Sequence, residues 1–254
     1  MKKIILFFSF ACICFFGCLN TEEDVTTNAD GSGIYKNAVD LSGLFDMMQM
    51  MASMDTSAGA GLKELSDKNI DSTIEFKSFI DTVTSLTKEQ KQLFEKATVW
   101  IKINQEEKAF KLTMNYPFSK IDDLQKLIEL QESDKLPNPL KQSMGNELPD
   151  AGSGGLPSIG KIMNMRFEKG LIERKIDQEK LNELKNNEQL KEAGNMEQML
   201  EAISFSSSFR LPKPAKNISG EKLKLSADKK TVSINYNLMD VIKNPALLEF
   251  KIEY

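Results

Sequence analysis

The stretch TVWIKINQEEKAFKLTMNY, residues 98–116, carries the pattern that decides the fold. Val99, Ile101 and Ile103 alternate with polar or amphipathic residues, a polar run follows at 105–108, and apolar residues then alternate again. Alternation with a period of two is typical of strands with one buried face. Two such strands around a short polar segment predict a β-hairpin.

The order hairpin then helix occurs three times along the chain. Hairpins are predicted at 23–41, 98–116 and 162–176, and Asp or Gly residues supply the turns of the first and third. Helical spacing of apolar residues predicts helices near 44–54, 76–83, 88–97, 121–128 and 178–190, and strands follow at 204–211, 222–226, 231–238 and 247–254.

Local signals mark several boundaries of these elements. Ser72-x-x-Glu75 and Thr87-x-x-Gln90 have the spacing of capping boxes, which begin helices. Asp177 has the side chain of a helix N-cap, and Pro117 predicts the end of its strand.

These elements predict an α+β fold, a mainly antiparallel β-sheet built from β-hairpins with helices packed on one face. The chain divides into a signal peptide at 1–17, a tether at 18–22, an α+β part at 23–132, a Pro- and Gly-rich linker at 133–160 and a second α+β part at 161–254. We expect the two α+β parts to share one sheet.

The first eighteen residues indicate an exported lipoprotein. Lys2 and Lys3 precede an almost unbroken apolar run that ends at Gly17-Cys18. The run has the features of a secretory signal and is too short for a permanent membrane helix. Its end at 15–18 resembles a bacterial lipobox, which implies cleavage before Cys18 and attachment of lipid there. We expect a lipid anchor in the outer membrane, on either its periplasmic or its surface face; an ordinary signal peptide cut elsewhere is the alternative.

Composition excludes several classes of function. The sequence has no histidine, which removes the Ser-His-Asp triad and most zinc and iron sites. Two of the three cysteines lie within the signal, and loss of Lys2 and Lys3 takes the net charge from −4 to −6, which disfavours nucleic acid as a partner. We therefore expect no metal, no cofactor and no enzymatic activity, with a hydrolase that works without histidine as an outside alternative.

A candidate ligand site follows from the methionine-dense segment 44–54. Methionine side chains repack easily, so they suit core filling or an adaptable surface for a greasy ligand; copper(I) is a further alternative. The predicted lining of a lipid-like site is Phe45, Met48, Met51, Phe79 and Trp100. The leading hypothesis is a binding or structural module that holds such a ligand. The alternative is a module that docks an envelope protein through its exposed sheet face.

Several short motifs resemble those of known families. Asp71-Ser72-Thr73 and Asp81-Thr82-Val83 resemble the O-glycosylation signal of Bacteroidota, which implies sugar on Ser72 and Thr82. Glu22-Glu23-Asp24 resembles the acidic export signal of Bacteroidota surface lipoproteins, with the solvated start of a strand as the alternative.

Longer segments carry two wider resemblances. Cys18 with the acidic run after it, Asp30-Gly31-Ser32-Gly33 and Tyr116-Pro117-Phe118 resemble a family of Bacteroidota outer-membrane lipoproteins with no assigned activity. Phe209-Arg210-Leu211-Pro212 followed by Thr231-Val232-Ser233 is distantly similar to mycobacterial envelope lipoproteins with a lipid-binding domain.

Overall fold

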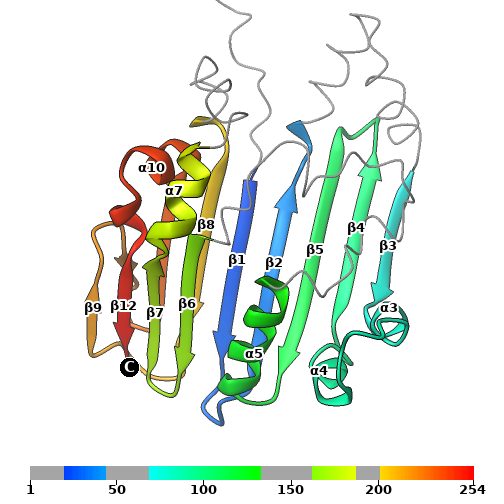
Figure 1. The fold of residues 1–254 in the computed structure, drawn as a ribbon, viewed down its shortest axis with the longest axis horizontal. Coiled ribbons are helices and arrows are strands. Elements are labelled where there is room, and N and C mark those ends of the chain that lie inside the picture. Colours follow the sequence, from blue (N-terminus) through cyan, green and yellow to red (C-terminus); the bar gives the residue numbers. More distant parts are fainter. Residues whose placement is uncertain (1–19, 44–68, 133–161, 187–200) are drawn as a thin grey trace, which may run out of the picture.

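The computed structural model describes residues 20–43, 69–132, 162–186 and 201–254 (Figure 1). The predicted signal peptide, the lipid site Cys18, the helix at 44–54 with Phe45, Met48 and Met51, and the linker at 133–160 lie outside the described residues.

Two β-sheets form the body of the molecule. The larger sheet has the strand order β10-β11-β8-β1-β2-β5-β4-β3, and all its neighbours are antiparallel except the parallel pair β1 and β8. Its strands are β1 (Asn20–Thr27), β2 (Gly33–Asp40), β3 (Ile70–Glu75), β4 (Thr98–Asn104), β5 (Ala109–Phe118), β8 (Ser204–Arg210), β10 (Lys224–Leu225) and β11 (Thr231–Asn237). The smaller antiparallel sheet, in the order β6-β7-β12-β9, contains β6 (Met163–Glu168), β7 (Leu171–Ile176), β12 (Phe250–Glu253) and β9 (Asn217–Ser219).

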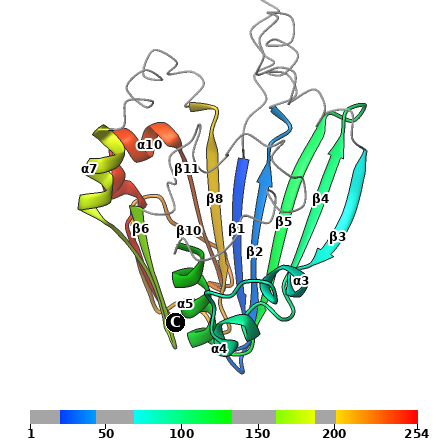
Figure 2. The same cartoon turned by 45° about the vertical axis from the view of Figure 1, so that its right-hand side comes forward.

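The smaller sheet and the helices lie on one face of the larger sheet. Figure 2 shows the two sheets leaning together, with α5 between them. The helical elements are α3 (Lys77–Ile80), α4 (Lys88–Gln92), α5 (Ile121–Glu132), α7 (Gln178–Asn186), α10 (Leu238–Lys243) and the 3-10 turn η4 (Pro245–Leu248). Figures 1 and 2 place these helices on the same side of the larger sheet, so the predicted α+β arrangement is confirmed.

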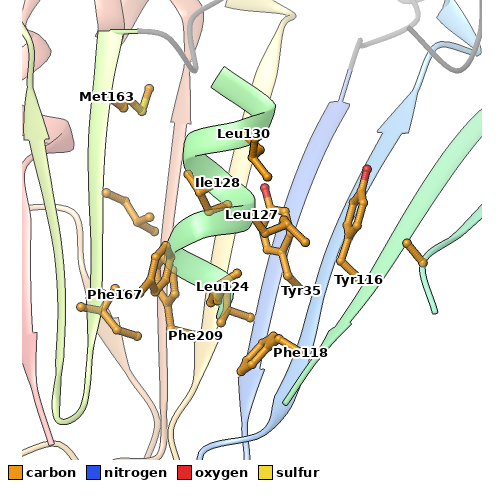
Figure 3. Close-up of a cluster of buried hydrophobic side chains, with 14 of the residues drawn as sticks. Tyr35, Tyr116, Phe118, Leu124, Leu127, Ile128, Leu130, Met163, Phe167 and Phe209 are labelled. Atoms are coloured by element: carbon orange, nitrogen blue, oxygen red, sulfur yellow. The ribbon is translucent and has the colours of Figure 1, made fainter. Parts of the chain in front are cut away.

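Side chains of both sheets and of α5 fill the space between the layers. Leu124, Leu127 and Ile128 of α5 point into a cluster with Phe167 of β6 and Phe209 of β8 (Figure 3). Phe209 also meets Phe250 of β12, with ring centroids 5.3 Å apart. Because these side chains are almost completely buried, the hydrophobic effect holds the two sheets and the helix in one core.

The three predicted hairpins and two predicted helix starts are confirmed. The hairpins are β1–β2, β4–β5 and β6–β7. Thr87 and Gln90 form the expected capping box at the start of α4, with bonds of 2.9 and 3.3 Å. The Asp177 carboxylate accepts from the backbone N–H groups of Glu179 and Lys180 at the start of α7.

Among the predicted boundaries that are wrong, two have a clear cause in the pairing of strands. Ser72 does not begin a helix but lies in β3, where Ser72 pairs with Ile101 of β4; the long-range pairing overrides the local signal. Pro117 does not end β5, which continues to Phe118 and pairs there with β2. Because β4 begins only opposite Asn115, β5 has a free side near Pro117, where a missing N–H costs no ladder bond.

The two α+β parts meet in the larger sheet. β8 and β11 from the second part extend it beside β1, with Asn20 opposite Ser204 and Val25 opposite Phe209. The smaller sheet is built only from the second α+β part. Four strands of that part therefore lie outside the sheet that the two parts share.

Candidate functional site

A surface cleft of about 630 Å³ lies between α4 and α5, over the end of β5. Its lining combines five apolar residues, three of which are buried, with mostly exposed charged residues of both signs. The lining residues are Glu89, Gln90, Gln92, Leu93, Glu95, Lys96, Pro117, Phe118, Ser119, Asp123, Lys126, Leu127, Glu129 and Leu130. The volume falls within the range of ligand-binding pockets.

Both walls of the cleft are fixed by specific contacts. The Thr87 capping box sets the start of α4, and Phe94, just after that helix, packs against Phe76 and Tyr116 with ring centroids 5.5 and 5.9 Å apart. α5 is held by Gln125, whose Oε1 accepts from the Phe167 N–H at 2.8 Å. The cleft is therefore a feature of the folded body and not of a loose surface turn.

The charge on the rims is unbalanced. Glu89, Glu95, Asp123 and Glu129 face only Lys96 and Lys126 within the lining, an excess of two negative charges. A backbone hydrogen bond and the Thr87 side chain lower the pKa of Glu89, which keeps that carboxylate ionised. Of these four carboxylates, Glu95 has an ion-pair partner, Lys77, 3.5 Å away.

A second polar cluster lies buried between the two sheets. Arg174 of β7, with a side chain that is 2% exposed, donates through Nη2 to Glu23 of β1 at 3.1 Å and to Ser207 of β8 at 2.9 Å. Its guanidinium lies over the rings of Tyr236 and Phe250, 5.7 and 4.8 Å from their centroids. Arg174 Nη1 is buried without a hydrogen-bond partner among the described residues.

Two buried tyrosines, Tyr35 and Tyr116, pair across β2 and β5, and Tyr35 lies near Glu23. Burial, followed by the charge of Glu23, raises the pKa of Tyr35 well above its ordinary value. Burial raises the pKa of Tyr116 to about 12. Figure 3 shows both hydroxyl groups on the inner face of the larger sheet, beside α5. These tyrosines are neutral at physiological pH and contribute polar packing, with no poised acid or base among them.

The structure does not bring Phe79 and Trp100 together. Trp100 alternates with the buried Val99 and Ile101, so it faces the outer side of the larger sheet, where its Nε1 donates to Asp71 at 2.9 Å. Phe79 is half-buried on the inner side, 6.0 Å from the ring of Phe76. The described part of the predicted ligand lining therefore belongs to two separate surfaces.

The structure also shows where the residues that resemble modification and export signals lie. Ser72 lies exposed on the edge strand β3, and Thr82 is exposed after α3, where its hydroxyl donates to the Phe79 carbonyl at 2.7 Å. Glu23 is not a solvated residue, since its side chain is 17% exposed and pairs with Arg174.

The cleft and the Arg174 cluster were both missed by sequence reasoning. The cleft joins two helices from separate stretches of sequence, so no spacing indicates it. Arg174 did have a signal, because it occupies an inward position between Ile172 and Ile176 in an alternating strand. A charged residue at such a position predicts a buried partner of opposite charge.

Within the described residues, no three His, Cys, Asp or Glu side chains lie close enough to share a metal ion. In the same part of the chain, every helix is too short or too polar to cross a bilayer.

Comparison with known proteins gives one distant structural likeness. No protein-family model and no curated protein sequence matches the chain. The fold is similar to the NMR structure of the folded domain of LppM from Mycobacterium tuberculosis, with a TM-score of 0.39 and 8% identity over 93% of this chain and 90% of that one. The likeness is thus to a mycobacterial protein, at a level that carries no argument about function.

Proposed function

We propose that this protein is a lipid-anchored protein of the cell envelope, and that its folded body is a non-enzymatic module that docks a partner in the cleft between α4 and α5. Cys18 carries the anchor in this proposal, and the resemblance to Bacteroidota lipoproteins supports the outer membrane as its location. The complete lack of histidine supports a binding role over a catalytic one.

The position of β1 supports a body held close to the bilayer. β1 begins at Asn20, so Leu19 alone separates it from Cys18. Two residues reach about 7 Å at full extension. β1 is an inner strand of the larger sheet, with β8 on one side and β2 on the other, so the anchor would restrain the whole sheet and not a loose tail.

The cleft is the observation that carries the docking role. The space between the sheets is filled by large side chains such as Phe167, Phe209 and Ile234, which are less than 2% exposed. The cleft, by contrast, opens to solvent and combines a little exposed apolar surface, from Leu93 and Pro117, with charged rims. This combination is typical of surfaces that bind another polypeptide.

A lipid-like ligand remains a second candidate because of the apolar part of the cleft lining. Leu93 and Pro117 are the apolar lining residues with exposed surface that an acyl chain could contact. The mature chain purified without its anchor distinguishes the two, since a carrier retains lipid that mass spectrometry of an organic extract detects. A docking module gives a clean extract.

The anchor is tested by Cys18→Ser. We expect the variant to escape lipid labelling and to keep its uncut signal peptide, so that it migrates on a gel as the longer precursor. Normal processing of Cys18→Ser would contradict the lipoprotein assignment.

The cleft is tested by photocrosslinking in intact cells. A photoreactive residue replaces Gln92, an exposed residue of the cleft lining, or Gln105, an exposed residue of the β4–β5 turn outside the cleft. We expect a discrete crosslinked species from position 92 and none from position 105. Equal patterns from both positions would contradict docking in the cleft.

A further inference from the structure

The charged side chains on the cleft rims differ in whether another side chain of the protein binds them. Glu129 accepts from Gln125 Nε2 at 2.9 Å, and Glu95 has Lys77. Asp123 is half-buried on the α5 wall and forms no ion pair with any residue that the structure describes. An ionic group of this kind, next to apolar surface, gains most from a partner that brings the opposite charge.

The shape of the cleft favours a particular kind of segment. Two helical walls with the half-buried Leu93 and the exposed Pro117 between them form a groove that can accept the apolar face of an amphipathic helix. Lys77 neutralises Glu95, so the rims keep an excess of one negative charge, which favours positive side chains along the polar face of that helix.

The pairing of the strands places the cleft away from the anchored end of the sheet, which disfavours a lipid of the anchoring membrane as its ligand. Phe118, in the cleft lining, pairs with Gly33, which pairs with Thr27 at the far end of β1. Seven residue steps of about 3.3 Å separate Thr27 from Asn20, so this part of the cleft lies level with a point about 23 Å along the strand from the anchored end. Anionic lipid headgroups would in addition be repelled by the rims.

We propose that the natural occupant of the cleft is a basic amphipathic segment of a partner protein. This inference rests on the proposed docking function and adds the chemistry of the partner. Leu93 and Pro117 bind the apolar face of the segment, and Asp123 with Glu89 binds its lysine or arginine side chains.

The test uses the mature chain with Cys18→Ser, which keeps every residue that the structure describes and needs no detergent. Two fluorescent peptides serve as probes: a short amphipathic helix with Leu on one face and Lys on the other, and the same peptide with Glu in place of Lys. Fluorescence anisotropy measures the affinity of each peptide. We expect the Lys peptide alone to bind, more weakly as salt rises, because exposed charges are screened over about 10 Å at 0.1 M.

Asp123→Lys supplies the decisive variant, and Asp122→Lys is its matched control. The two aspartates are neighbours in the first turn of α5, so both changes cost the helix the same favourable charge, but Asp122 is exposed outside the cleft lining. We expect Asp123→Lys to weaken binding of the Lys peptide roughly 3- to 10-fold, with little change from Asp122→Lys. Lys126→Glu should strengthen binding, with the exposed Lys120→Glu as its control.

The outcomes separate the inference from the proposed function. Equal binding of both peptides, or equal effects of Asp123→Lys and Asp122→Lys, overturns the basic partner and leaves docking in the cleft intact. Binding to vesicles of phosphatidylglycerol that Asp123→Lys strengthens also overturns it, in favour of a lipid. If neither peptide binds, the inference fails, and a lack of crosslinks from position 92 then removes the docking function as well.

Discussion

Arg174 joins the two sheets at a single buried point. Its Nη2 reaches Glu23 on β1 and Ser207 on β8, and Ser207 in turn donates to the same Glu23 oxygen at 2.9 Å. A buried ion pair contributes little net stability over apolar residues of the same volume, but loss of one partner leaves an uncompensated charge in the core. The pair therefore fixes which strands of the two sheets face one another.

Arg174→Met is expected to destabilise the protein strongly. The substitution leaves the mostly buried Glu23 without its cation, which costs about 3 kcal/mol or somewhat more in free energy of unfolding. Chemical denaturation followed by circular dichroism measures this loss. Adding Glu23→Gln to Arg174→Met should cost less than the sum of the two single changes, by about 1–3 kcal/mol, because the residues act as one unit.

Arg166→Met on β6 is the control for this cycle. Arg166 is 56% exposed and pairs with Glu168, which is also exposed, so its removal should change stability by no more than about 0.5 kcal/mol. An Arg174→Met variant that unfolds like Arg166→Met would show that the buried pair does not hold the sheets together.

At the scale of elements, α5 protects the open edge of the smaller sheet. β6 is the edge strand, and an unpaired edge exposes backbone groups that invite aggregation. Gln125 covers two of these groups, since its Oε1 accepts from the Phe167 N–H and its Nε2 donates to the Met165 carbonyl at 3.4 Å. One amide side chain thus takes the place of a neighbouring strand and positions a wall of the cleft.

Gln125→Ala should loosen β6 without unfolding the larger sheet. The Phe167 N–H loses its acceptor, a change that costs about 1–3 kcal/mol for a buried donor. Amide exchange should therefore speed up at Phe167, while β1 and β2 keep their protection. Lys126 is exposed and lies one residue along the helix, so Lys126→Ala serves as the control. Faster amide exchange in both variants would show that the effect comes from α5 as a whole and not from the hydrogen bonds of Gln125.

Elements with a local cause were predictable from the sequence, and those set by distant partners were not. The hairpin at 98–116 depends on alternation and on a turn within one stretch, and the cap at Thr87 depends on one residue three positions away. The strand status of Ser72 depends on β4, and the cleft depends on α4 and α5 meeting over β5. Only the contacts of the folded chain decide such features.

At the scale of the whole molecule, the two ends of the larger sheet have different surroundings in the proposed anchored state. Asn20 begins β1 beside the anchor, and the β4–β5 turn at 105–108 lies at this same end, because β1, β2 and β5 are paired in register. The β1–β2 turn around Ala29 lies at the opposite end, where the cleft opens. An upright sheet would therefore present the cleft to the aqueous phase and to a partner protein.

Energy transfer from the protein to the bilayer tests this orientation. Gln105→Cys and Ala29→Cys place a donor dye at exposed turns of the two ends, in a mature chain whose only other cysteine, Cys18, is expected to be blocked by lipid. With acceptor lipids in the bilayer, the dye at position 105 should transfer strongly and the dye at 29 weakly, since one strand length of about 23 Å separates the two levels. Equal transfer from both positions would mean that the sheet lies flat on the membrane. Stronger transfer from position 29 would mean that the cleft faces the lipid, which would favour a lipid ligand over a protein partner.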